Sequence, residues 1–299
     1  MKVQTYAGID IGSNAIRLLI NDIEHTSSDT NYNKACYIRV PIRLGADVFT
    51  QGVISEAKRY RMIEAFKGFH HMMKAYGVRH FRCCATSAMR EAKNGVAVVE
   101  EVARQSGISI EIISGQEEAD LVYQASNSMK IFNDQDNYLY VDVGGGSTEI
   151  ICYARGQKRT SRSFQLGTVR LLAHDCAAEF DAMVDWLDEV CSQFTPDAII
   201  GSGGNINKLH KILGRKRMES IYYFEMKRLY EQLSAMSIQE RVSHLSLNAY
   251  RADVIVPAMN IFLIIAQRTA ISEIIVPKVG LGDGIIHQLY QANHASNHL

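Results

Sequence analysis

Two segments of the chain combine an aspartate with a glycine-rich turn, a pattern that can bind phosphate and a divalent cation. One segment runs from Ala7 to Ile20 and the other from Tyr140 to Ile151. In each, a β-branched run ends in aspartate, one residue and glycine, and a second apolar run follows, which predicts a hairpin. Successive amides of such a turn bind anions, and the carboxylate lies where it can hold Mg²⁺. A single turn of this kind is usually structural, but two related copies favour a pair that faces across a cleft.

The second hairpin carries the larger set of polar groups. Asp142 and Glu149 lie on opposite strands, seven residues apart, so both side chains can point at the same turn. A Mg²⁺ ion held by them, with Asp10 of the first hairpin as a further ligand, would bridge phosphate oxygens and offset the charge of a breaking bond. Without the intervening glycines, Glu149 would be expected to be a solvated strand residue. The expected phosphate donors of the two turns are Ser13, Asn14, Gly144, Gly145, Gly146, Ser147 and Thr148.

Charged side chains outside the turns supply further chemistry. Glu117 and Glu118 open a predicted helix that runs from Gln116 to about Met129, where carboxylates also complement the positive end of a helix. Arg90 follows a predicted strand and can bind phosphate through two N–H groups, although an arginine in such a loop is usually solvated. Arg17 is another candidate phosphate ligand, and it could equally form a structural ion pair.

Two more segments are candidates for phosphate binding. Gly203 and Gly204 follow a predicted strand and precede a helix, which suits either a phosphate site or a tight turn that needs glycine for backbone reasons. No segment matches the G-x-x-x-x-G-K-[ST] phosphate-binding loop. A basic run could track a long polyanion, although such runs are usually solvated helix ends. It comprises Lys208, Lys211, Arg215, Lys216 and Arg217.

The elements that position these groups must form about two domains. The chain has 299 residues, and one core serves roughly 150. With 47% hydrophobic and 21% charged residues, the composition is that of a folded globular protein. Lysine plus arginine equals aspartate plus glutamate at 32 each. No net positive field therefore points to nucleic acid or to a membrane.

The cysteines and the apolar stretches indicate a cytoplasmic protein. The six cysteines show no C-x-x-C motif, no zinc spacing with histidines and no secretory leader before them, so we expect them to be reduced and mostly buried. The longest apolar stretch, Val254 to Ala266, is broken by Pro257 and Asn260. It is shorter than the roughly 20 residues of a membrane span, and we expect a buried helix.

Strands and helices are expected to alternate as in α/β proteins. Between the hairpins, the patterns predict a strand at 35–44, a helix at 55–77, a strand at 78–85, a helix at 94–106 and a strand at 108–113. The second half repeats this order, with strands at 137–143, 149–154, 158–165, 197–200 and 273–276 and helices at 181–193 and 249–270. A final helix, preceded by the glycines at 280–284, is expected to return to the first domain.

Five segments together resemble the successive motifs of the exopolyphosphatase/guanosine pentaphosphate phosphatase (Ppx/GppA) family. They occur in the family's order over nearly the whole chain, at 10–17, 85–92, 113–119, 142–149 and 166–171. The resemblance implies an α/β fold, a duplicated ribonuclease-H-like structure of the actin-like ATPase superfamily, with the active site in a cleft between two domains. We expect residues 1–127, completed by a helix at 282–299, to form the first domain and residues 128–281 the second.

The resemblance also implies roles for single residues. Glu118 aligns with the family's glutamate that deprotonates the attacking water, and Glu117 is its neighbour and the second candidate. The same resemblance supports Arg90 as a phosphate ligand. The chain departs from the family at Gly282, where an arginine is common in the motif Gly-Leu-Arg-Glu/Asp-Gly.

The expected function is Mg²⁺-dependent hydrolysis of the terminal phosphate of inorganic polyphosphate. The alternative within the enzyme class is hydrolysis of the 5′ phosphate of guanosine pentaphosphate (pppGpp), because the same cleft handles any terminal phosphoanhydride. A nucleotide-responsive binding protein is the alternative from another class, but a sensor does not need both carboxylate sets. A phosphotransferase would need an acceptor pocket that the sequence does not identify. We expect no nucleic acid or membrane partner, and a chain that acts alone or as a homodimer.

Overall fold

The computed structural model describes residues 3–26, 30–128, 135–216, 218–245 and 247–295. The chain divides into two compact units, one formed by residues 1–128 and 281–299 and the other by residues 129–280. The domain boundaries expected from the sequence, after residues 127 and 281, each differ by one residue from the boundaries between the two units.

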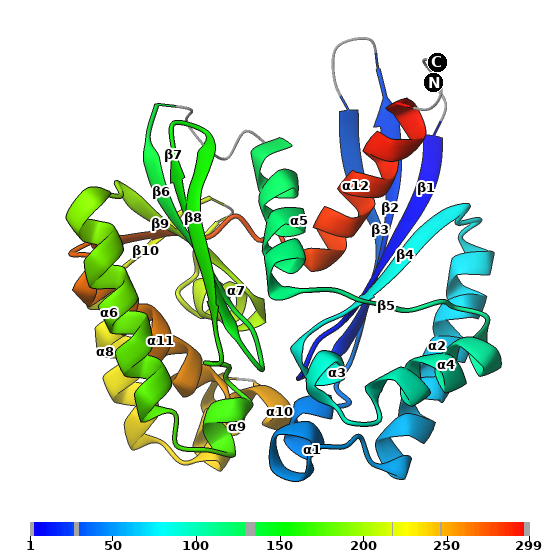
Figure 1. The fold of residues 1–299 in the computed structure, drawn as a ribbon, viewed down its shortest axis with the longest axis horizontal. Coiled ribbons are helices and arrows are strands. Elements are labelled where there is room, and N and C mark those ends of the chain that lie inside the picture. Colours follow the sequence, from blue (N-terminus) through cyan, green and yellow to red (C-terminus); the bar gives the residue numbers. More distant parts are fainter. Residues whose placement is uncertain (1–2, 27–29, 129–134, 217, 246, 296–299) are drawn as a thin grey trace. The chain divides into compact units, whose positions relative to one another are not determined.

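The first unit is built on a five-stranded sheet with the order β3-β2-β1-β4-β5 (Figure 1). β1 and β2 are antiparallel, as are β2 and β3, whereas β4 runs parallel to β1 and β5 parallel to β4. The strands are β1 (Val3–Ile11), β2 (Ile16–His25), β3 (Thr30–Val40), β4 (His80–Ala85) and β5 (Glu111–Ile112). The helices are α1 (Leu44–Gln51), α2 (Glu56–Ala75), α3 (Ser87–Glu91), α4 (Gly95–Ser106), α5 (Gly115–Ser128) and α12 (Leu281–Ala295).

The second unit repeats the plan in a six-stranded sheet with the order β10-β11-β9-β6-β7-β8. β6, β7 and β8 form an antiparallel meander, β9 runs parallel to β6 and β11 parallel to β9, and β10 is added at the edge. The strands are β6 (Asn137–Val143), β7 (Thr148–Ala154), β8 (Gln157–Phe164), β9 (Ala198–Ser202), β10 (Ser220–Tyr222) and β11 (Glu273–Ile275). The predicted duplicated α/β plan is therefore confirmed.

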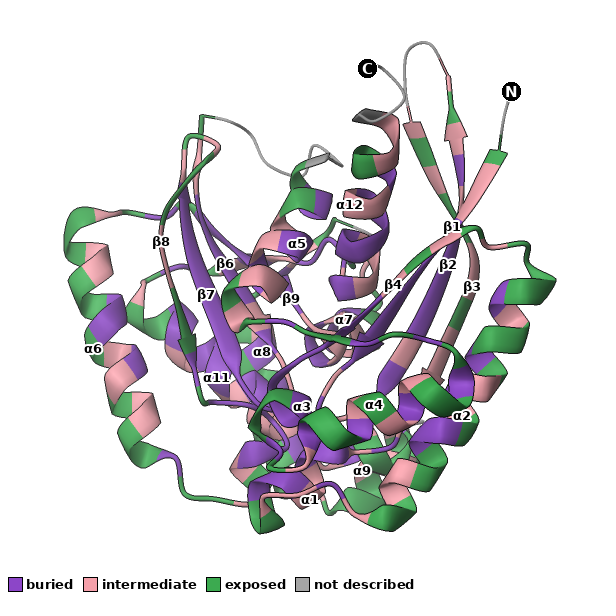
Figure 2. Ribbon diagram, turned by 45° about the vertical axis from the view of Figure 1, so that its right-hand side comes forward, coloured by how far each residue is buried: buried purple, intermediate pink, exposed green. Residues whose placement is uncertain are grey.

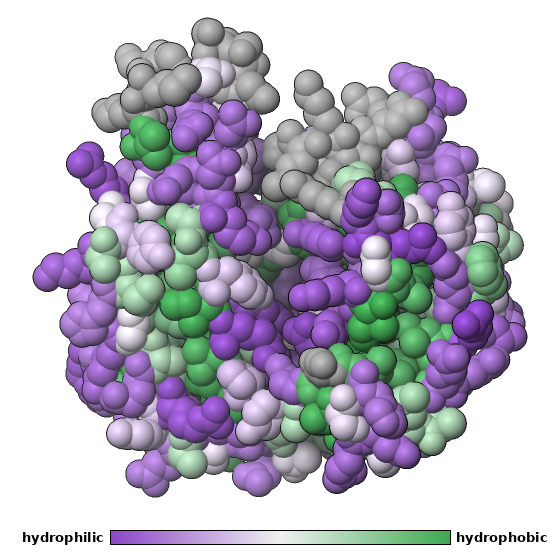
Figure 3. All heavy atoms as spheres, turned by 180° about the vertical axis from the view of Figure 1, so that it is seen from behind, coloured by the Kyte–Doolittle hydropathy of each residue, from purple (hydrophilic) through white to green (hydrophobic). Residues whose placement is uncertain are grey.

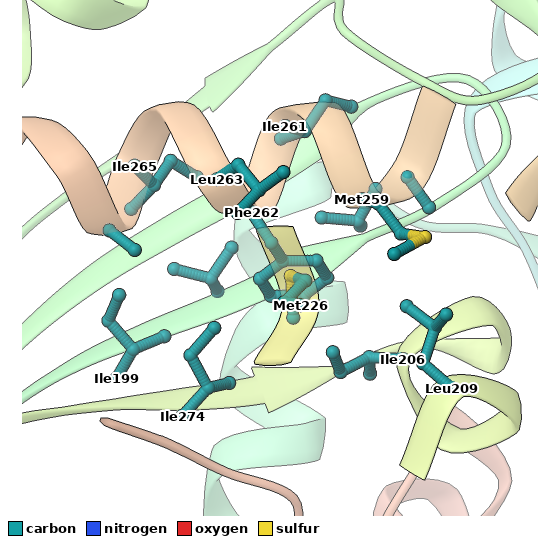
Figure 4. Close-up of a cluster of buried hydrophobic side chains, with 14 of the residues drawn as sticks. Ile199, Ile206, Leu209, Met226, Met259, Ile261, Phe262, Leu263, Ile265 and Ile274 are labelled. Carbon is teal, nitrogen blue, oxygen red and sulfur yellow. The ribbon is translucent and has the colours of Figure 1, made fainter. Parts of the chain in front are cut away.

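Helices cover the second sheet and close its core. They are the 3₁₀ turn η1 (Arg170–Leu172), α6 (Ala177–Gln193), α7 (Gly204–Ile212), α8 (Tyr223–Ala235), α9 (Ile238–Leu245), α10 (Ala249–Ala252) and α11 (Ile255–Arg268). Figure 4 shows Phe262 of α11 among Met226 of α8, Ile199 of β9 and Ile274 of β11, all of them buried. This apolar core holds the strands that end at the turn between β6 and β7.

The predicted helix at 249–270 is wrong as a single element, because it is interrupted at Asp253 and Val254. Pro257 is the third residue of α11, in the first turn, where its missing N–H has no partner to lose. The segment Ala249–Arg268 is the one stretch of the described residues long and apolar enough to cross a membrane. Its side chains instead line the core of the second unit, as predicted for a buried helix.

The last helix begins earlier than predicted, so that Gly282 and Gly284 lie inside it. Close packing within the first unit requires glycine at Gly8 and Gly284. A Cβ atom on Gly8 of β1 would lie 2.6 Å from the carbonyl oxygen of Gly282, and one on Gly284 would lie 2.4 Å from that of Leu121. A larger residue at Gly8 would keep α12 away from β1, and one at Gly284 would keep α12 away from α5.

The surface and the cysteines agree with the composition. Strands β1, β2, β6 and β7 are largely buried, whereas β3, β8 and the outer faces of α2, α4 and α6 are more exposed (Figure 2). On the face shown in Figure 3, hydrophilic side chains cover most of the surface, with apolar patches among them. Cys83, Cys84, Cys152 and Cys176 are buried thiols. Burial raises the pKa of Cys84 to about 12, so this thiol stays protonated at neutral pH.

Candidate active site

The turn between β6 and β7 presents a row of polar side chains. Asp142 pairs directly with Glu149 across the two strands, and with Ser202 of β9 on its other side. Directly paired residues point to the same face of a sheet. Glu149 is buried and its Oε1 accepts hydrogen bonds from the hydroxyls of Ser147 at 2.6 Å and Ser163 at 2.9 Å. The predicted orientation of Asp142 and Glu149 toward one turn is thus present.

The carboxylate of Asp142 is also held in place. Ser202 Oγ donates to its Oδ2 at 3.2 Å. Asp142 further raises the pKa of Tyr140, a phenol whose pKa is already raised mainly by burial, so Tyr140 stays neutral. The serine hydroxyls on Asp142 and Glu149 offset part of the cost of bringing two carboxylates together.

The backbone of the second turn is braced from one side by residues 167–170. Gly144 O accepts from Thr168 N at 3.0 Å, Gly145 O from Val169 N at 2.8 Å, and Gly146 O from Arg170 Nε at 2.7 Å. In a trans peptide the N–H points opposite to the C=O. The amides of Gly145, Gly146 and Ser147 are therefore directed away from the bracing loop, as three neighbouring donors that suit a phosphate.

Gly167 makes this bracing sterically possible. A Cβ atom at this position would lie 2.2 Å from the carbonyl carbon of Gly146. The two backbones are thus in direct contact, and only glycine fits. Thr148, by contrast, uses its hydroxyl to bind Leu166 O and is fully buried, so its side chain holds the strand rather than a ligand.

The turn of the first hairpin is braced in the same way. Gly12 N donates to Ala15 O at 3.1 Å, just as Gly144 N donates to Ser147 O at 3.0 Å. Its carbonyls are engaged by the start of α1: Ser13 O accepts from Gly45 N at 2.8 Å and Asn14 O from Arg43 N at 3.1 Å. By the same peptide geometry, the amides of Asn14 and Ala15 point away from α1.

The two turns differ in the residue that faces the aspartate. Asp10 pairs across the strands with Arg17, at the spacing at which Asp142 pairs with Glu149. Arg17 and Asp10 form a salt bridge in which the carboxylate is nearly buried. The structural ion pair, the alternative interpretation of Arg17, is therefore present, and a guanidinium already neutralises the Asp10 carboxylate.

The start of α7 reaches the end of β6. Gly203 adopts φ 108°, a region that favours glycine, and a Cβ atom there would lie 2.7 Å from Val143 O and 3.2 Å from Asp142 Oδ1. The tight-turn interpretation of Gly203 is thus supported by its geometry. Gly204 is the first residue of α7, so its amide lies at the positive end of the helix.

In the first unit, the start of α5 gathers the catalytic candidates. Ser114 Oγ accepts a hydrogen bond from Glu117 N at 3.1 Å, which caps the helix, and Glu118 N donates to Ser114 O at 3.0 Å. Arg90, exposed at the end of α3, donates through Nη1 to Ile113 O at 2.7 Å. Arg90, Glu117 and Glu118 are therefore brought to one place. The Glu117 carboxylate accepts a hydrogen bond from Arg82 at 2.8 Å.

The basic run is less cationic than its sequence. Arg215 forms an ion pair with Glu225, whereas the Lys216 hydrogen bond to Glu219 uses the backbone N–H and leaves the lysine charge as it is. Lys208 has a lowered pKa, mainly through burial and also through repulsion from Lys211 and Arg251. Arg217 lies outside the described residues. Among the described residues of the run, the lysines stay the candidates for a polyanion track.

The described residues contain no cluster of three or more histidine, cysteine, aspartate or glutamate side chains suited to a metal. Mg²⁺ typically binds one or two carboxylates and keeps several waters. The pair Asp142 and Glu149, which share one face of the sheet, fits that requirement.

Several residues that shape the site are not among the sequence candidates. They are Arg43, Gly45, Arg82, Ser163, Gly167, Arg170 and Ser202. Gly167 and Arg170 lie in a segment that resembles a family motif, which is the one sequence signal for them. The serines and Arg82 depend on strand pairing that no local pattern reveals.

The comparisons with known proteins agree with this arrangement. The model of the Ppx/GppA phosphatase family matches residues 37–293. The chain belongs to this family. The similarity to the Ppx/GppA family covers α5, the second turn and its bracing loop, so the residues discussed above lie mostly within the matched region.

Relatives in the Ppx/GppA family carry different names. The chain is 24% identical over 298 residues to a guanosine-5′-triphosphate,3′-diphosphate pyrophosphatase of Vibrio campbellii, which covers 95% of this chain and 59% of the relative. It is 31% identical over 168 residues to a bifunctional 3-dehydroquinate synthase/phosphatase of Fusobacterium nucleatum, covering 55% of this chain and 25% of the relative. The chain thus spans less than two thirds of the length of the first relative and a quarter of the second.

Solved structures of similar length share the fold. An exopolyphosphatase from Cytophaga hutchinsonii has a TM-score of 0.85 at 23% identity, covering 97% of this chain and 98% of that one. The Aquifex aeolicus member of the Ppx/GppA family has a TM-score of 0.79 at 24% identity, covering 98% and 99%. The fold is therefore that of the Ppx/GppA family over nearly its whole length.

Proposed function

We propose that this protein hydrolyses the terminal phosphoanhydride bond of a linear phosphate chain, with Mg²⁺ as its cofactor. The observation that carries the proposal is the second turn. Three braced amides there lie next to two carboxylates that share one face of the sheet. Fixed amide dipoles stabilise the charge that develops on a transferring phosphoryl group, and they need no reorganisation during the reaction.

The cofactor proposal rests on Asp142 and Glu149. Serine hydroxyls orient both side chains, as outer partners of metal ligands usually do. A bound Mg²⁺ would supply charge neutralisation at the phosphate oxygens. Asp10 is the weaker ligand in this proposal, because its carboxylate is paired with Arg17.

The first unit supplies the remaining groups of the proposal. Glu118 takes the proton from the attacking water, and Arg90 binds the phosphate through guanidinium N–H groups beyond the one that donates to Ile113. The amides of the first turn, with Ser13 and Asn14, act as further donors. The proposal requires these groups and those of the second turn to act on one substrate.

Inorganic polyphosphate is the proposed substrate, and pppGpp is the second candidate. The similar structure from Cytophaga hutchinsonii is named an exopolyphosphatase, whereas the Vibrio relatives are named for guanosine pentaphosphate hydrolysis. The two differ beyond the terminal phosphates, so a direct comparison separates them. We would measure phosphate release on long polyphosphate, tripolyphosphate and pppGpp side by side and compare kcat/KM.

The decisive variant is Glu118→Gln, with Glu100→Gln on the exposed face of α4 as the control. Loss of a general base should lower kcat by roughly 10²-fold or more, while substrate binding persists. The control should keep wild-type turnover. Near wild-type turnover of Glu118→Gln would contradict the proposed base. Ligand binding without any turnover by the wild type would instead favour a nucleotide-responsive binding protein.

A further inference from the structure

Arg82 lies at the centre of a charged network that the proposed chemistry does not use directly. It stands on β4, and its side chain is only 14% exposed. Its Nε and Nη2 both donate to Glu111 of β5, at 3.0 and 2.6 Å. Nη2 also donates to Glu117 of α5 at 2.8 Å, and Nη1 donates to Gln288 of α12 at 2.6 Å.

Only an arginine can serve all of these partners at once. The guanidinium is planar and presents five donors in a fixed fork, whereas a lysine ammonium is a single point of charge. Glu111 and Glu117 raise the pKa of Arg82, so the cation persists at every physiological pH. A side chain on one strand thereby ties together β5, α5 and α12 of the first unit.

This network fixes the first turn of α5 from a second side. Ser114 caps the helix from within the chain, and Arg90 holds Ile113, the residue before the cap. Arg82 adds the restraint on the Glu117 side chain, which is adjacent to Glu118 in the same turn. A misplacement of about 1 Å at a reacting group can cost as much as 10²-fold in rate, so restraint of this turn bears directly on Glu118.

We propose that Arg82 is a positioning residue, which acts through Glu117 to orient the first turn of α5 and to offset the Glu117 charge beside the base Glu118. The inference rests on the proposed function, since it needs Glu118 to act as a base. Without the Arg82 guanidinium, the Glu117 carboxylate would be an uncompensated like charge next to Glu118. A like charge disfavours the deprotonated form that a base requires.

The test uses Arg82→Gln, Arg82→Lys and the double variant Arg82→Gln/Glu117→Gln, assayed for phosphate release from pH 4.5 to 8.5. Arg82→Gln should lower kcat by about 10-fold, with KM changed by less than about 2-fold, and should move the acid limb of the kcat profile to higher pH. Arg82→Lys should restore the acid limb but not kcat. The double variant should return the acid limb to its wild-type position, because the Glu117 negative charge has been removed as well.

Arg59→Gln is the matched control, because it removes the Arg59–Glu101 ion pair that joins α2 and α4 of the same unit. It should leave the pH profile and kcat unchanged. If Arg82→Gln unfolds, Glu117→Ala removes the partner without disturbing β4, and it should lower kcat at unchanged KM. An Arg82→Gln variant that is merely less stable, with the wild-type acid limb and kcat, would overturn the inference.

Failure of this inference is distinct from failure of the proposed function. Wild-type turnover in Glu118→Gln would reject Glu118 as the base, and with it the role of Arg82, while the hydrolysis itself would stand. A wild type that releases no phosphate from any of the three substrates would reject the proposed function. An inactive Glu118→Gln together with an unshifted Arg82→Gln would leave the function in place and reject only the role of Arg82.

Discussion

The two hairpin turns have the same backbone design and opposite electrostatics. Each is closed by one hydrogen bond, and each is braced on its carbonyl side by a loop that follows the third strand of the meander. In the first turn the aspartate faces Arg17, and in the second it faces Glu149. One charged residue thus makes the first pair formally neutral and the second pair dianionic. Under the proposed function, the duplicated scaffold supplies amide donors twice but the main divalent-cation site once.

The largest loss of activity should come from giving the second turn the aspartate–arginine pair that the first turn has. Glu149→Arg would place a cation opposite Asp142 and should reduce phosphate release by about 100-fold or more, because the metal's charge and position are both lost. The reciprocal Arg17→Glu should cost less, about 10-fold, since the first turn is proposed to supply only the weaker ligand, Asp10. The two variants are compared by their initial rates of phosphate release at saturating Mg²⁺. A larger loss in Arg17→Glu would reverse the comparison.

The next largest loss of activity should come from substituting the glycines that allow the turns to be braced, Gly167 and Gly45. A Cβ atom at Gly167 would overlap the backbone of Gly146, whereas one at Gly45 would meet the Phe49 ring at 2.6 Å and Ser13 Cβ at 2.9 Å. A ring can shift more cheaply than backbone, so Gly167→Ala should lower kcat more than Gly45→Ala. Overpacking of this kind costs about 1–3 kcal/mol of stability. Thermal unfolding and kcat of both variants check the order, and equal losses would argue against the bracing account.

A smaller effect concerns the pH dependence of stability. Burial lowers the pKa of His287 in the first unit and of His210 in the second, where a hydrogen bond with Glu219 O partly opposes it. A lowered folded-state pKa means that the unfolded chain binds more protons below about pH 6.5. The stability is complete above that pH and falls as the pH decreases toward the folded-state pKa.

Urea unfolding at pH 5.5 and 7.5 measures this difference. The wild type should have a lower midpoint at pH 5.5, and His287→Leu should reduce that pH dependence more than His210→Leu does. A substitution of exposed His71 should leave it unchanged. If His210→Leu reduced the pH dependence of stability more than His287→Leu does, burial would not be the dominant cause of that pH dependence at His287.

The sequence predicts the duplicated plan well because hairpins and amphipathic helices are local patterns. The strand at 137–143 and the direct pairing of Asp142 with Glu149 follow from residue alternation and turn length. The bracing of the second turn does not follow, since it joins Gly144 to Thr168, 24 residues apart, through backbone groups that every residue carries. The early start of α12 depends on the close approach of Gly8 and Gly282, which lie at opposite ends of the chain.

Arg17 shows the limit of sequence reasoning at the site itself. Its spacing from Asp10 allows either a phosphate contact or an ion pair, and only the cross-strand register shows the pair. That the two turns face each other across a cleft stays a prediction. So do the homodimer and the cytoplasmic location.

The central claim is that the second turn, rather than the first, supplies the main ligands of the divalent cation. The most direct measurement is the Mg²⁺ concentration for half-maximal phosphate release in Asp142→Asn, Glu149→Gln and Asp10→Asn. Loss of a ligand should raise it by roughly 10-fold or more in the two second-turn variants. Asp10→Asn should change it by no more than about 2-fold. An unchanged Mg²⁺ dependence in Asp142→Asn and Glu149→Gln, or a larger shift in Asp10→Asn, would contradict the account.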